Sequence, residues 1–274
     1  MRLGIGSYTY GWSSGTYGSD TSQHAGFAYL TAHDLIDRAV QLDVPLVQIC
    51  VKPDLASMDD QELLALRNYA ETNGKALEIG TVGSDPDHLL RFLQIAQMLG
   101  ANLVRTIFTS ASPGLVEERQ QIAQLAEQFA AAQVYLAIEN HEAASFLDLA
   151  SLCQEIDNDY VGVCLDTVNS LGRGEGLREV TTALMPFTKC LHVKDFTVHR
   201  HKSDMELTIT GAPAGEGKLD IPAQLWMLRN VQPEATVVLE QWVPFQGNLA
   251  QTIERQDSWA ESSVRYLKKH LAEL

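Results

Sequence analysis

YLAIE, at residues 135–139, is the first of four short apolar segments that each end in a residue able to bind a metal. The four segments are YLAIE (135–139), VGVCLD (161–166), CLH (190–192) and TVVLE (236–240), which end in Glu139, Asp166, His192 and Glu240. Apolar runs of this length, rich in Val, Ile and Leu, are typical of strands buried on both faces of a parallel sheet. A polar residue closing such a strand lies at the carboxyl edge of the sheet, where α/β enzymes place their chemistry. The four ends therefore predict one site.

The spacing of these residues indicates that they lie on strands that neighbour one another in the sheet. Asp166 follows Glu139 by 27 residues, and His192 follows Asp166 by 26. Each step is close to the roughly 30 residues of one strand–helix–strand unit. The longer step of 48 residues from His192 to Glu240 fits one such unit plus a long polar loop, expected over 196–218.

The set of ligands indicates the kind of metal. Two glutamates, an aspartate and a histidine form a hard, oxygen-rich set that suits one divalent cation, Mn²⁺, Mg²⁺ or Zn²⁺. Taken singly, each acidic residue has an alternative role as a helix N-cap or a solvated loop residue. The metal interpretation depends on all four residues closing their strands in the same way, at the same edge of the sheet.

The rest of the chain alternates in the same way and predicts a single-domain (β/α)₈ TIM barrel over residues 1–274. Strands are expected at 2–8, 46–51, 76–82, 103–108, 135–140, 161–166, 190–194 and 236–241. Helices are expected at 31–43, 59–74, 84–100, 115–132, 144–157, 175–185, 219–230 and 248–273, with Thr31 and Ser84 as N-caps and Gly100 as a terminal glycine. A long loop is expected over 8–26. The competitor is an open doubly wound sheet, which is disfavoured because GIGSYTYG lacks the third glycine of a dinucleotide-binding turn.

Composition limits the partners. The net charge of −15 without a basic stripe opposes nucleic-acid binding, and no apolar run approaches the length of a membrane span. The four cysteines form no C-x-x-C pair and are expected to be buried free thiols, which together with the lack of a signal peptide predicts a cytoplasmic protein. The expected partner is a small-molecule sugar or sugar acid. A homodimer or homotetramer is compatible with the sequence.

Five motifs resemble one known family. IENHE contains Glu139, CLDTVNS contains Asp166, LHVKD contains His192, VVLEQW contains Glu240, and GAPAGEG precedes the helix expected at 219–230. As a set they resemble the xylose isomerase-like TIM barrel superfamily, in particular its sugar isomerase and epimerase branch, which is related to endonuclease IV. Two positions depart from many of those epimerases: Asn169 stands where they carry a histidine, and Arg200 is only a loose match to their arginine.

The resemblance implies a divalent-metal-dependent isomerase or epimerase acting on a ketose-like sugar through an enediolate. Glu139 and Glu240 would then both bind the metal and exchange protons with the two faces of the substrate; a purely ligating role for at least one of them is the alternative. Lys194 is the third candidate catalytic residue. The alternative enzyme is a lyase, a decarboxylase or dehydratase of a keto sugar acid, in which Lys194 and Arg105 supply a proton donor and a cation that recognises the carboxylate.

Five further residues are expected to contact substrate. They are His141, Arg105, Tyr8, Asn169 and Trp242. Each has an ordinary alternative: capping or support of a ligand for His141, support of a ligand for Asn169, charge balance for Arg105, and packing for the two aromatic residues. A salt bridge to a ligand carboxylate is the corresponding alternative for Lys194.

Overall fold

Eight parallel strands close into a barrel in the computed structural model, which describes residues 1–18, 27–109, 115–201 and 205–274. The strands are β1 (Leu3–Gly6), β2 (Leu46–Cys50), β3 (Ala76–Gly80), β4 (Leu103–Ile107), β5 (Tyr135–Glu139), β6 (Val161–Asp166), β7 (Thr188–Val193) and β10 (Thr236–Leu239). Their order around the barrel is β1-β10-β7-β6-β5-β4-β3-β2. The predicted (β/α)₈ barrel is confirmed.

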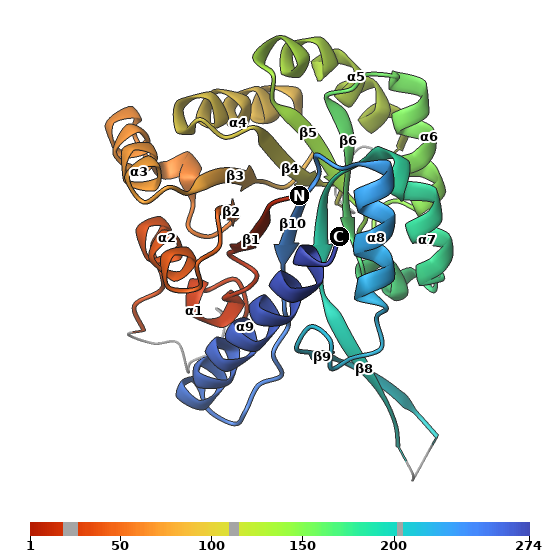
Figure 1. Ribbon diagram of the computed structural model, residues 1–274. Helices are drawn as coiled ribbons and strands as arrows, with labels where there is room; N and C mark the ends of the chain where they lie inside the picture. The colour runs from red at the N-terminus through yellow and green to blue at the C-terminus, as the bar shows by residue number, and fades with distance from the viewer. Residues whose placement is uncertain (19–26, 110–114, 202–204) are drawn as a thin grey trace.

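Helices connect the strands and surround the barrel (Figure 1). They are α2 (Ala32–Gln41), α3 (Asp60–Thr72), α4 (Pro86–Leu99), α5 (Leu115–Ala132), α6 (Phe146–Ile156), α7 (Leu177–Leu184), α8 (Ile221–Val231) and α9 (Leu249–Ala272). Shorter helical turns are α1 (Gly11–Ser14), η2 (Leu55–Ser57), η3 (Asn169–Arg173) and η4 (Met185–Phe187). Among the residues described, no helix is long and apolar enough to cross a membrane.

Local capping explains where two of the helices begin. Thr31 caps α2 as predicted, in a capping box with Asp34. For α4 the prediction was wrong by one residue: Asp85, and not Ser84, accepts a hydrogen bond from the backbone N–H of His88. Pro86 then fills the first helical position, where its missing N–H costs nothing. Gly100 ends α4 in the left-handed conformation, as expected.

The expected polar loop over 196–218 is instead largely a β-hairpin. Strands β8 (Asp195–Arg200) and β9 (Leu207–Ala212) pair antiparallel, with Val198 opposite Ile209. The segments FTVHR and LTITG alternate threonine or histidine with apolar residues, a period of two that favours strands. In Figure 1 the hairpin projects away from the barrel. Within the expected loop over 8–26, α1 forms, and residues 19–26 lie outside the described part of the chain.

The core has two parts. The larger lies between the strands and the helices, and a smaller cluster fills the barrel, consisting of Leu46, Leu103, Ala137, Cys164, Cys190 and Val238. All four cysteines are buried and free, as predicted. The barrel interior is therefore closed below its mouth by side chains and is not a channel.

Candidate active site

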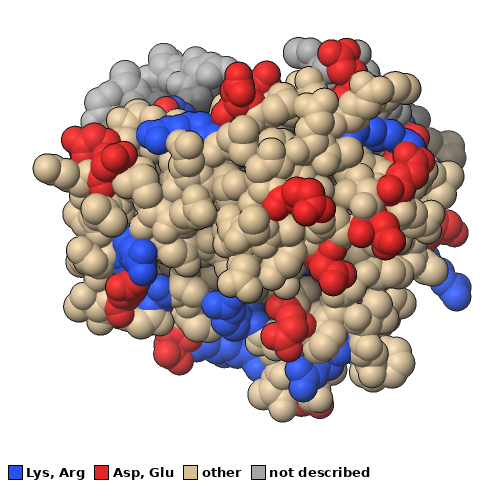
Figure 2. All heavy atoms as spheres, turned by 90° about the horizontal axis from the view of Figure 1, so that it is seen from above, with Lys and Arg blue, Asp and Glu red and all other residues tan. Residues whose placement is uncertain are grey.

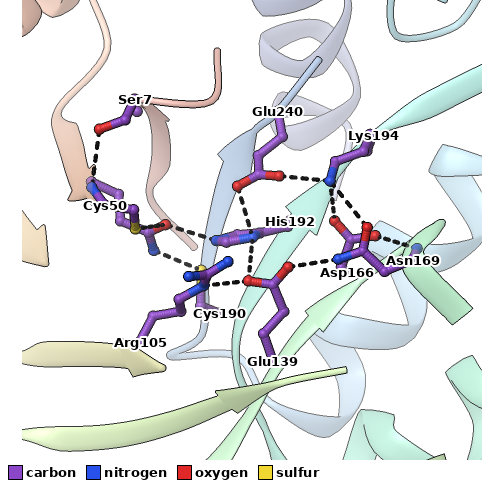
Figure 3. A network of polar contacts seen from close by, with 12 residues as sticks. Ser7, Cys50, Arg105, Glu139, Asp166, Asn169, Cys190, His192, Lys194 and Glu240 are labelled. Atoms are coloured by element: carbon purple, nitrogen blue, oxygen red, sulfur yellow. Dashed lines mark hydrogen bonds and ion pairs between the residues drawn. The ribbon is translucent and has the colours of Figure 1, made fainter. Parts of the chain in front are cut away.

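Neighbouring strands bring four side chains together at the carboxyl end of the barrel. They are Glu139, Asp166, His192 and Glu240, at or near the ends of β5, β6, β7 and β10. Each side chain offers one potential ligand atom, and these four atoms all lie within 4.8 Å of one another. All four residues are buried. Figure 3 shows the side chains converging from their separate strands.

His192 presents one ring nitrogen to the carboxylates. Its Nδ1 lies 3.0 Å from Oε1 of Glu240 and 3.4 Å from Oε2 of Glu139. Among the described residues this buried nitrogen has no hydrogen-bond partner, whereas Nε2 is hydrogen-bonded to Oε1 of Gln48 at 2.7 Å. An unpartnered imidazole nitrogen facing three carboxylates fits a hard divalent cation. Burial alone would lower the pKa of His192, but Cys164, Glu240 and Glu139 around it raise that pKa well above its usual value.

Hydrogen bonds fix both the side chain and the backbone of Asp166. Its Oδ1 accepts hydrogen bonds from the backbone N–H groups of Val168 and Asn169, both at 2.7 Å. The side chain of Asn140 accepts from the N–H of Asp166 at 2.7 Å and donates to its carbonyl oxygen at 3.0 Å. This leaves Oδ2 directed toward Nζ of Lys194 at 2.8 Å.

Lys194 bridges two of the carboxylates. Besides Asp166, its Nζ lies 2.9 Å from Oε2 of Glu240 and 3.3 Å from Oδ1 of Asn169. Burial opposes the charged form of Lys194, but Asp166 and Glu240 outweigh it and raise the lysine pKa well above its usual value. Lys194 follows directly after β7 and is therefore fixed by the barrel rather than by a mobile loop.

Glu139 has a donor on each oxygen. Arg105 on β4 donates to Oε2 through Nε, and Asn169 donates to Oε1 at 2.8 Å. Burial favours the neutral form of Glu139, but Arg105 and His192 hold its pKa well below the usual range. The guanidinium of Arg105 also lies over the ring of Tyr8, 5.8 Å from its centroid. Asn169 thus links Glu139 to Lys194.

A pocket of about 500 Å³ opens above these groups. All five residues expected to contact substrate line it: His141, Arg105, Tyr8, Asn169 and Trp242. Three of the charged residues described above also line it: Glu139, Lys194 and Glu240. Tyr17 and Ile209 also line the pocket and were not predicted, because each lies in a segment that the sequence marked only as loop. Asp166 and His192 are buried and are not part of the pocket lining.

Two polar residues near the ligands were also missed. Asn140 directly follows Glu139 in IENHE, and that adjacency was the only available signal. Gln48 lies on β2, far from the ligands in the sequence, and nothing in LVQICV marked it. Arg200, the loose match to the epimerases' arginine, lies exposed on the hairpin and does not line the pocket.

The closed barrel carries a buried group of four potential metal ligands at its carboxyl end, and comparison with known proteins gives the family. The chain belongs to the xylose isomerase-like TIM barrel family, whose model matches residues 36–270. The predicted resemblance is therefore confirmed, and with it a superfamily of sugar-processing enzymes.

Individual relatives carry different activities. A 3-oxo-isoapionate decarboxylase from Pectobacterium atrosepticum is 28% identical over 269 residues, covering 97% of this chain and 95% of that protein. The crystal structure of D-psicose 3-epimerase with D-tagatose from Clostridium cellulolyticum H10 matches with a TM-score of 0.73 and 14% identity, covering 99% of each chain. A xylose isomerase-like protein from Mycobacterium smegmatis in complex with magnesium matches with a TM-score of 0.66 and 15% identity, covering 96% and 97%. At these identities the two structures show a shared fold alone.

Proposed function

We propose that the protein is a divalent-metal-dependent lyase that decarboxylates a 3-oxo sugar acid. Its metal ligands would be Glu139, Asp166, His192 and Glu240. When bound, the cation polarises the substrate carbonyl and stabilises the negative charge that develops on its oxygen. The class of substrate is suggested by the decarboxylase that is similar over nearly the whole chain.

The observation that carries the proposal is the arrangement of cations and carboxylates around the pocket. In an epimerase Glu139 and Glu240 would have to bind the metal and also serve as acid and base, and Glu139 would have to do both while its two oxygens accept hydrogen bonds from Arg105 and Asn169. Two cations, Lys194 and Arg105, line the pocket beside them. These two cations and a divalent ion balance the three ligand carboxylates and Glu142, which also lines the pocket. Lys194 and Arg105 are therefore the positive side chains of the described lining that a substrate carboxylate would meet.

The residues take the following roles in this reaction. Arg105 attracts the substrate carboxylate, and the bond between the carboxylate carbon and the neighbouring carbon breaks, releasing CO₂. The electron pair of that bond remains on the substrate as an enediolate. Lys194 donates a proton to that carbon, and its position between Asp166 and Glu240 holds the ammonium group in place. Tyr8 and Trp242 form apolar walls of the pocket.

A metal-dependent isomerase or epimerase of a ketose-like sugar is the second candidate. The observation that favours it is that Glu139 and Glu240 both line the pocket, on either side of His192. This arrangement would place a carboxylate on each face of a sugar.

One experiment separates the two candidates. Purified protein with Mn²⁺ is incubated with 3-oxo sugar acids carrying a labelled carboxylate, and separately with ketoses in D₂O. Labelled CO₂ that disappears on adding EDTA supports the lyase. If a ketose with an intact carbon skeleton incorporates deuterium and no acid releases CO₂, the lyase proposal is wrong and the protein is an isomerase or epimerase.

A further inference from the structure

A chain of buried polar groups runs from His192 down into the barrel. Nε2 of His192 lies 2.7 Å from Oε1 of Gln48 on β2, and Nε2 of Gln48 donates to Oε2 of Glu78 on β3 at 3.0 Å. These three residues are at most 2% exposed. The barrel interior around them is otherwise largely apolar, so each polar group there needs a partner.

The partners of Gln48 fix the direction of its amide. Its NH₂ group donates to Glu78 and also lies 3.4 Å from Sγ of Cys190. Its oxygen faces His192 and accepts from the thiol of Cys50 at 3.4 Å. In this orientation each end of the amide has a complementary partner, because the NH₂ group faces a carboxyl oxygen and the amide oxygen faces the His192 ring and a thiol.

That orientation determines which nitrogen of His192 carries a proton. Because the oxygen of Gln48 only accepts, the ring must donate through Nε2–H. In the neutral imidazole the lone pair is then on Nδ1, which faces Glu139 and Glu240. A histidine ligand is commonly oriented through a hydrogen bond from its other ring nitrogen.

We propose that Gln48 and Glu78 are positioning residues, which hold the His192 ring with Nδ1 directed into the ligand cluster. Glu78 acts only through Gln48, by holding its NH₂ group. The part of this inference that concerns metal affinity rests on the proposed metal site; the part that concerns the ring does not.

The first test measures affinity for Mn²⁺ by isothermal titration calorimetry. Gln48→Leu removes the acceptor for His192 and is expected to weaken binding about 10–100-fold, the usual cost of losing such a partner. Gln224→Leu is the matched control, since Gln224 is a buried glutamine on α8, away from the site, and should keep the wild-type affinity. Circular dichroism checks that each variant is folded.

A second pair of variants tests Glu78 and guards against a misfolded Gln48→Leu. Glu78→Leu removes the acceptor for the amide of Gln48 and should weaken Mn²⁺ binding, whereas Glu78→Gln retains an oxygen acceptor and should recover most of the affinity. Equal affinity in Gln48→Leu, Glu78→Leu and the wild type would overturn the proposal.

The ring itself is observed by NMR of metal-free protein with isotope-labelled histidine. The wild type should show a slowly exchanging Nε2–H from the buried ring of His192, and Gln48→Leu should lose its protection. If the wild type binds no divalent cation, the proposed function fails, and this measurement still decides the positioning role. A protected Nε2–H that is unchanged in Gln48→Leu would refute that role.

Discussion

At the residue scale, Lys194 combines a chemical and a structural role. Lys194→Gln removes the proposed proton donor and is expected to lower kcat roughly 10²–10⁴-fold. Without metal it also leaves Asp166 and Glu240 facing each other without their shared cation, which should cost about 3 kcal/mol of unfolding free energy.

Steady-state kinetics and urea unfolding, each with and without Mn²⁺, measure the two effects of Lys194. Added Mn²⁺ should restore most of the stability of Lys194→Gln without restoring kcat. Lys194→Arg retains the charge and serves as the comparison for stability. A fully active Lys194→Gln would remove Lys194 from the chemistry.

Glu78 gives a pH-dependent prediction. Burial, reinforced by Cys190, raises the pKa of Glu78 to about 8, although Gln48 and Arg2 act in the opposite direction. A carboxyl group whose pKa is higher in the folded state stabilises the fold below its unfolded pKa, and this contribution is lost as the pH rises through the folded value. The free energy of unfolding should therefore fall between about pH 5 and pH 8 more steeply in the wild type than in Glu78→Gln. Urea unfolding across this range measures both slopes; parallel curves would contradict the prediction.

At the scale of the element, the β8–β9 hairpin contributes to the wall of the pocket. Ile209 lines the pocket, and Gly211 on the same face of β9 lies against Trp242. A Cβ at position 211 would lie 1.7 Å from Cδ1 of Trp242, so no larger residue fits while the indole keeps its place. The hairpin and Trp242 therefore form one packed unit.

Gly211→Ala should displace Trp242 and raise KM roughly tenfold or more, since lost packing of this kind in a pocket commonly costs 10–200-fold in specificity. The affinity for Mn²⁺ should stay the same because the ligands lie on other strands. Thr208→Ala, on the opposite face of β9, is the control and should keep the wild-type KM. Steady-state kinetics measure both variants, with the 3-oxo sugar acid or ketose that the wild type turns over in the labelling experiment. An unaffected KM in Gly211→Ala would exclude Trp242 from substrate contact.

At the scale of the whole molecule, the negative charge is spread over the surface while the cations of the site are buried. The net charge is −15, and on the face shown in Figure 2 the Lys and Arg side chains form small groups separated by acidic and uncharged residues. Lys194 and Arg105 are both buried in the pocket wall. The positive charge that the proposed function requires is therefore provided by side chains in the pocket wall and not by a basic surface.

Metal binding should stabilise the whole barrel, because the four proposed ligands come from four strands. Mn²⁺ at about 100 times its Kd adds about 2.7 kcal/mol to a protein that binds it only when folded, which corresponds to a rise of roughly 5–10 °C in Tm. Differential scanning calorimetry with EDTA or with Mn²⁺ measures this shift. Asp166→Asn should reduce the shift, and a wild-type Tm unaffected by Mn²⁺, Mg²⁺ or Zn²⁺ would argue against the metal site.

Pattern in the sequence was sufficient for the barrel and for the grouping of the four proposed ligands. Strands such as VGVCLD are buried on both faces and read as apolar runs, and each run ends in a polar residue at the same edge of the sheet. This information is local, because the alternation within a strand and the length of a strand–helix–strand unit can both be read along the sequence without knowing which distant residues are in contact. The hairpin shows the limit of the approach, since its alternation was present in the sequence but short and polar enough to resemble a loop.

Only the tertiary structure decided which partners each polar group has. Gln48 and Glu78 appear in the sequence as single polar residues within apolar strands, and their contact with each other and with His192 joins positions up to 144 residues apart. Asn169 likewise matched a known position, but its bridge between Glu139 and Lys194 depends on three strand ends meeting. The sequence determines where polar side chains occur along the chain. Closure of the barrel determines which of them lie within hydrogen-bonding distance, because that distance depends on strand register and packing around the whole circle.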